Sequence, residues 1–95
     1  MALLSSFTKQ PREILDFDID YSTVLAGRTD TIVTKVVEVA PTGQLTIVSS
    51  NIIGNIIKVI VSSGNTGITY KVTVLATSTA GLVYEDEVNV LVEEV

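Results

Sequence analysis

The chain of 95 residues lacks cysteine, histidine and tryptophan altogether. Without cysteine it forms no disulfide and offers no thiol, so nothing in it requires an oxidising compartment. Without histidine or cysteine, the common catalytic triads cannot be built. A carboxylate pair of the glycosidase kind is formally possible, but the acids alternate outward along strands and leave little chain for a cleft. We therefore expect no enzymatic activity and no cofactor.

Long apolar stretches are also missing. The longest uninterrupted ones, such as residues 59–61, fall far short of the roughly 18 residues that a membrane-spanning helix needs. Residues 1–4 are too short for the apolar core of a signal peptide and have no basic start. The sequence thus predicts no membrane segment and no export through the Sec pathway.

Basic residues are few, and the net charge is −5. Phosphates repel an acidic protein, which argues against nucleic acid or an anionic membrane as a partner. Nine of the eleven acidic residues lie toward the two ends of the chain: Glu13, Asp16, Asp18, Asp20, Glu85, Asp86, Glu87, Glu93 and Glu94. The intervening segment, residues 21–84, is slightly basic by comparison.

The chain is rich in β-branched residues, with 15 valines, 10 isoleucines and 12 threonines. They fall into runs of alternating polarity separated by glycine, asparagine and serine, which is typical of strands joined by turns. About seven such runs follow one another at the spacing of a β-sandwich. The sequence predicts one all-β domain over residues 14–95, an antiparallel immunoglobulin-like sandwich of about seven strands.

Alternation also assigns the inward side chains. We expect a core that includes Leu15, Phe17, Ile19, Ile47, Tyr70, Val72, Val74, Val88 and Val90. Both faces of the run over residues 29–40 are apolar, so the pattern leaves open which one is buried. Residues 22–27 are expected to continue the preceding strand past a kink, and residues 49–51 to interrupt another. Tyr70 stands where immunoglobulin-type sandwiches carry a tyrosine whose hydroxyl bonds to nearby backbone.

Residues 1–13 show no period and contain loop-like serine, threonine, glutamine and proline. We expect an N-terminal arm that is poorly ordered by itself. Its apolar residues Leu3, Leu4 and Phe7 would dock on a partner, while Lys9 and Arg12 keep the segment soluble. The alternative is a frayed terminus without a role.

Three patterns resemble ligand sites but fit them poorly. Asp16, Asp18 and Asp20 suggest calcium, yet in a strand their carboxylates project about 6.6 Å apart, too far to share one ion. The glycine-containing loop at residues 64–67 precedes a strand rather than a helix, so it offers no phosphate site. Five aromatic residues are few for a carbohydrate platform. We expect no metal site.

The acidic segments carry a second expectation. In immunoglobulin-like wiring the first and last strands lie side by side, which would place Asp16, Asp18 and Asp20 near Glu85, Asp86 and Glu87. Opposed like charges are unfavourable, so the arrangement needs a reason. Either a charged edge discourages aggregation, or it docks on a basic partner surface. Asp86 falls in the inward phase and would need a bulge or the open end of the strand.

Two segments carry a family pattern. Residues 7–22, FTKQPREILDFDIDYS, open with Phe-x-Lys-x-Pro and continue into an acidic, aromatic strand; residues 61–87, VSSGNTGITYKVTVLATSTAGLVYEDE, combine Tyr-x-Val-x-Val with Thr-Ser-x-Ala-Gly. In these features the chain resembles a family of small structural proteins of tailed phages. That family is similar to fiber–tail adaptors and to immunoglobulin-like capsid decoration proteins. The chain departs from it at residues 22–24, where a tryptophan is common.

The resemblance implies a non-enzymatic structural protein of the virion, made in the host cytoplasm. It would bind other virion proteins, either of the capsid or of the tail and fiber, as a homo-oligomer or in several copies per particle. The alternative is a ligand-binding module for a host glycan or surface. The residues that we expect to bind partners are Leu3, Leu4, Phe7, Lys9, Arg12, Asp16, Asp18, Glu85 and Glu87.

Overall fold

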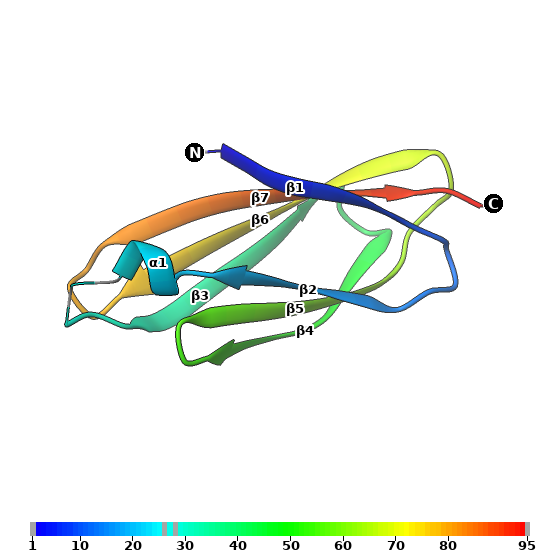
Figure 1. Cartoon of the computed structure of the whole chain (residues 1–95). Coiled ribbons are helices and arrows are strands. Elements are labelled where there is room, and N and C mark those ends of the chain that lie inside the picture. The colour runs from blue at the N-terminus through cyan, green and yellow to red at the C-terminus, as the bar shows by residue number, and fades with distance from the viewer. Residues whose placement is uncertain (1, 26, 28, 95) are drawn as a thin grey trace.

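The computed structural model describes residues 2–25, 27 and 29–94, with the backbone alone for residues 2–5. Two sheets pack face to face into an elongated sandwich that carries a one-turn helix at one end (Figure 1). The elements are β1 (Ala2–Lys9), β2 (Leu15–Asp20), α1 (Ser22–Leu25), β3 (Ile32–Ala40), β4 (Leu45–Ile53), β5 (Ile56–Ser63), β6 (Ile68–Ser78) and β7 (Val83–Val92). The prediction of an all-β chain of about seven strands is confirmed.

One sheet has the strand order β1-β7-β6-β3 and the other β2-β5-β4. Neighbouring strands are antiparallel except β1 and β7, which run parallel. The prediction of a wholly antiparallel sandwich is wrong for this pair. Because β1 leads into β2 of the opposite sheet, it forms no hairpin with a sequence neighbour and lies instead beside the last strand, running the same way.

Most of the predicted N-terminal arm is the strand β1. In its pairing with β7, Phe7 stands opposite Val90 and Lys9 stands opposite Val92. The expectation that this segment has no strand phase is therefore wrong. The alternation is hidden in the sequence because a lysine fills the inward position that follows Phe7, where an apolar residue would ordinarily mark the strand.

The core lies between the inward faces of the two sheets. Of the residues predicted there, six are buried: Ile19, Tyr70, Val72, Val74, Val88 and Val90. Phe17 and Ile47 are half-buried and pack against this core, and Leu15 is half-buried as well. Burial of a large apolar side chain stabilises a fold by about 1.5–3 kcal/mol, so the inward rows of β5, β6 and β7 supply much of the stability.

The structure shows which apolar face of β3 is buried. Val37 and Val39 pack against the core, whereas Val36 is 52% exposed. The pairing register with β6 shifts between Ile32 and Thr34. This bulge lets Ile32 be buried although it is out of phase with Val37, which explains why period-2 counting could not choose a face.

Two local predictions are wrong. Where a continued strand was expected, α1 forms, because the Asp20 side chain accepts a hydrogen bond from the Ser22 backbone N–H at 2.8 Å and turns the chain. β4 runs through residues 49–51 without a break. A register shift between Ile47 and Ser49 absorbs the irregularity within the strand.

Tyr70 ties two loops together at the end of the sandwich opposite α1. Its hydroxyl accepts a hydrogen bond from the Asn65 N–H at 2.8 Å and donates one to Gln44 Oε1 at 2.7 Å. The predicted bond between this tyrosine and nearby backbone is confirmed. Gly64 lies beside the Tyr70 ring and the Val92 side chain, and a Cβ at this position would stand 2.7 Å from Val92 Cγ2. Its backbone φ of +97° is one that glycine alone adopts readily.

Candidate partner-binding surfaces

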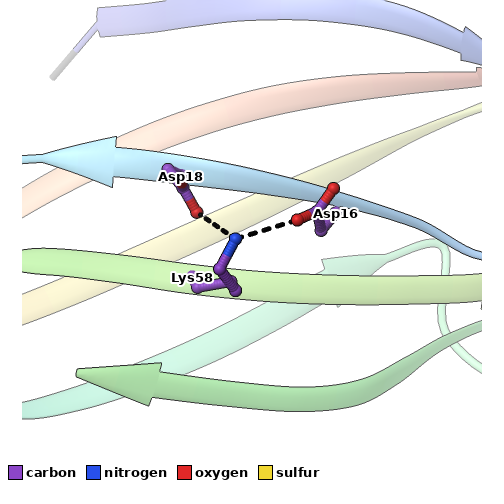
Figure 2. A network of polar contacts seen from close by, with 3 residues as sticks. All are labelled: Asp16, Asp18 and Lys58. Carbon is purple, nitrogen blue, oxygen red and sulfur yellow. Dashed lines mark hydrogen bonds and ion pairs between the residues drawn. The ribbon is translucent and has the colours of Figure 1, made fainter. Parts of the chain in front are cut away.

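Two carboxylates of the acidic strand β2 form ion pairs with a lysine of β5. Asp18 stands opposite Lys58 in the pairing of the two strands. Figure 2 shows the Lys58 ammonium between two carboxylates, 2.9 Å from Asp16 Oδ2 and 3.1 Å from Asp18 Oδ1. The hydrogen bond from Lys58 holds the pKa of Asp16 below its ordinary value. The strand face that suggested calcium thus holds an amine, on a side of the sheet open to solvent.

The second acidic group points out of the other sheet. Glu85 and Glu87 face outward on β7, in alternation with the inward Tyr84, Asp86 and Val88. Glu87 lies 3.8 Å from the Lys71 ammonium. The expectation that β7 lies beside the acidic strand is wrong, since β2 belongs to the opposite sheet and β1 takes the place next to β7. Of the four predicted carboxylates, Asp18 and Glu85 line one common surface.

Asp86 has the inward position that the alternation predicts. Its Oδ2 accepts a hydrogen bond from the Tyr21 hydroxyl at 2.7 Å, which joins the start of β7 to the end of β2. Burial, reinforced by this carboxylate, raises the pKa of Tyr21, so the hydroxyl stays protonated and donates. The Tyr84 ring packs beside that of Tyr21, with centroids 5.7 Å apart. Asp86 is therefore satisfied at the open end of its strand by a donor from the opposite sheet.

Tyr21, Tyr84 and Asp86 belong to the lining of a groove of about 410 Å³, which we call the β2–β7 groove. Its lining consists of Asp18, Ile19, Asp20, Tyr21, Val24, Val83, Tyr84, Glu85 and Asp86. Val24 of α1 and Val83 of β7 are 51% and 61% exposed, so apolar side chains stand beside the hollow. Among the residues that the structure describes, the lining contains four carboxylates and neither lysine nor arginine. The Asp20 carboxylate accepts hydrogen bonds from Ser22, which lower its pKa and keep it charged.

The side chains predicted to bind partners from the N-terminal arm differ in their burial. Lys9 is buried, and its ammonium donates to the carbonyls of Gln10, Pro11 and Ser63 at 2.8, 3.2 and 2.6 Å. Burial lowers the pKa of Lys9, and its amine is turned away from any partner. Phe7 is half-buried against Phe17, with ring centroids 6.0 Å apart, whereas Arg12 is exposed. The side chains of Leu3 and Leu4 lie outside the described part of the chain.

Sequence reasoning missed the residues that give the groove its shape. Tyr21 and Tyr84 each fall in the inward phase beside an acidic run, and that shared context was the available signal. It could not be used without knowing that the ends of β2 and β7 meet across the two sheets. Val24 gave no signal, because α1 was expected to be strand.

Two packed sheets, with no described helix longer than one turn, place the chain among small all-β sandwich proteins. None of the described helical residues forms a segment long and apolar enough to cross a membrane. A family model described as the podophage GP4 fiber-tail adaptor protein gp77 matches residues 9–91. The chain belongs to this family of phage fiber–tail adaptors, which confirms the resemblance drawn from the sequence. No curated protein matches the chain.

Proposed function

We propose that this protein is a non-enzymatic structural component of the virion that joins fibers to the tail of a podophage. The family match carries the proposal, because it spans residues 9–91 and so includes β2 through β6 and nearly all of β7. The fold is compatible with this task. A joining protein needs a stiff body with separate surfaces for its partners, and a two-sheet sandwich offers such surfaces at its ends and faces.

We further propose that the sandwich is immunoglobulin-like. The strand order supports this, because β2-β5-β4 packs against β6, β7 and β3 as the B, E and D strands of immunoglobulin domains pack against F, G and C. The tyrosine that bonds to backbone at the start of β6 supports it as well. Cysteine and tryptophan, the markers of antibody domains, are absent from the sequence.

A glycan-binding role has less support. None of the five aromatic side chains is exposed: Tyr21 and Tyr70 are buried, and Phe7, Phe17 and Tyr84 are half-buried. Carbohydrate platforms stack sugars on exposed rings, so these surfaces do not offer one. The partners that we propose are tail and fiber proteins, contacted by several copies of this chain per particle. The candidate contacts include the exposed Arg12, Asp16, Asp18 and Glu85 and the half-buried Glu87.

The test is to assemble phage without this protein and examine the particles by electron microscopy. We expect complete heads and tails that lack fibers, and restored fibers when the protein is supplied during assembly. Normal fibers in its absence would refute the adaptor role. Labelled protein found over the capsid lattice would instead identify a decoration protein.

A further inference from the structure

We propose that the β2–β7 groove is the site at which an extended, basic segment of a tail or fiber protein docks, with a lysine or arginine side chain entering the groove. The proposal rests on the adaptor function proposed above and names the surface and the chemistry of its partner. Three properties of the groove carry it: its apolar walls, its charge, and the open backbone of β7 beside it.

The walls are apolar and accessible. Val24 and Val83 are about half exposed or more, and Leu82, next in the chain to Val83, is 38% exposed. Scattered apolar side chains are ordinary on a protein surface, but here Val24 and Val83 both line a hollow of about 410 Å³ at one end of the sandwich. They can pack against the aliphatic stem of a long side chain.

The charge of the groove selects a cation. Asp18 already shares Lys58 with Asp16, whereas the ion pairs of the described residues include neither Asp20 nor Glu85. A lysine or arginine that lays its stem on the valines would bring its charged head to these carboxylates. The half-buried Tyr84 ring in the floor adds a face on which a guanidinium can stack. An acidic segment would be repelled by these carboxylates, and a neutral one would gain only the apolar contact with the valines.

The backbone at the start of β7 can form hydrogen bonds with an extended segment of a partner. β1 pairs with β7 over positions from Asp86 to Val92, so this described pairing does not extend to Val83 and Tyr84. Their other side pairs with β6, where they stand opposite Thr77 and Ala76. An incoming segment can therefore add to this end of the sheet beyond β1 while its side chain enters the groove.

The deciding variant is Val83→Arg, which places a cation of this chain's own at the mouth of the groove. The matched control is Val48→Arg, with the same change of charge at a valine that is 52% exposed in the bulge of β4, in the other sheet. Both should fold, because both positions are exposed. The variants and the wild type are mixed with purified fiber protein, and separately with particles assembled without this protein, and binding is followed by sedimentation.

We expect Val83→Arg to weaken binding by at least about tenfold, either to the fiber protein or to the particles. Val48→Arg should change the same binding by less than about twofold. Glu85→Gln should weaken the same interaction and reduce its dependence on salt. If both groove variants bind as the wild type does, the groove proposal is wrong and the adaptor function stands. If Val83→Arg fails to fold, Glu85→Gln alone decides. A wild type that binds neither fiber nor particle refutes the adaptor function itself.

Discussion

At the end of the sandwich that holds the loop between β5 and β6, polar side chains close on the backbone of neighbouring loops. Lys9 donates to three carbonyls, and the Tyr70 hydroxyl joins Asn65 to Gln44. At the α1 end, Val24 and Val83 stand exposed around the β2–β7 groove instead. The first arrangement leaves few groups for a partner to satisfy, whereas the second leaves apolar side chains exposed and Glu85 outside the ion pairs of the described residues.

The contrast separates what stabilises the molecule from what is available for binding. A loop whose polar groups are satisfied internally can change little without loss of stability. A surface that the fold does not need can be altered at small cost, which is typical of a binding surface. The following substitutions compare the two ends directly.

The largest effect is expected at Gly64. In Gly64→Ala the new Cβ would meet Val92 Cγ2 at 2.7 Å in a left-handed backbone conformation, and we expect a loss of roughly 3 kcal/mol in the free energy of unfolding. The control at the α1 end is Gly81→Ala, where φ is +85° and no atom lies within 4 Å. Backbone strain alone should cost about 1 kcal/mol there. Denaturant titration measures both, and equal losses would contradict the tighter packing at Gly64.

A smaller difference is expected between two tyrosines. Tyr70→Phe removes two hydrogen bonds of a buried tyrosine, those to the Asn65 N–H and to the Gln44 side chain, and should cost about 2 kcal/mol. Tyr21→Phe removes one hydrogen bond to Asp86, which is only half-buried and can turn to water, and should cost about 1 kcal/mol. Thermal unfolding of the pair tests the ranking, and the reverse order would show that the α1 end is the more tightly held.

The alternation of β-branched residues was sufficient to predict the strands and most of the core, because period-2 burial follows directly from strand geometry. It failed where one side chain broke the rule, as Lys9 does in β1, or where a bulge changed the phase, as in β3. The groove could not be predicted, since it depends on which strand lies next to β7. That choice is made by the path of the chain between the sheets, and no local pattern records it.

A pH-dependent effect is expected from Asp30, which anchors the turn between β6 and β7 beside the groove. Its Oδ1 accepts hydrogen bonds from Thr79 Oγ1 and from the Ala80 N–H, the latter at 3.1 Å. These bonds, that from Thr79 first, lower the pKa of Asp30 to about 2. Because the folded pKa lies below the unfolded one, this stabilisation is complete above about pH 4 and is lost as the pH falls toward 2.

The measurement is the unfolding midpoint of the wild type between pH 2 and pH 7, compared with Asp30→Asn and Thr79→Val. Asp30→Asn should be less stable at neutral pH and should lose less on acidification. Thr79→Val keeps the carboxylate but removes one donor, so its profile should lie between the other two. A wild-type profile that Asp30→Asn leaves unchanged in shape would show that other carboxylates govern acid unfolding.

The smallest effect on stability is expected from the two acidic pairs, which the structure places on different faces. Asp16→Asn with Asp18→Asn leaves Lys58 without its carboxylates on an exposed sheet face, where ion pairs contribute little. Glu85→Gln with Glu87→Gln removes one charge from the groove and another from the outer face of β7. Neither double variant should shift the unfolding midpoint measurably. They should differ in binding, because only the second removes a carboxylate that is in the groove and free of Lys58. If both variants merely aggregate sooner and bind their partners as the wild type does, the acidic residues serve to prevent sheets of different molecules from associating. Docking through these residues is then excluded.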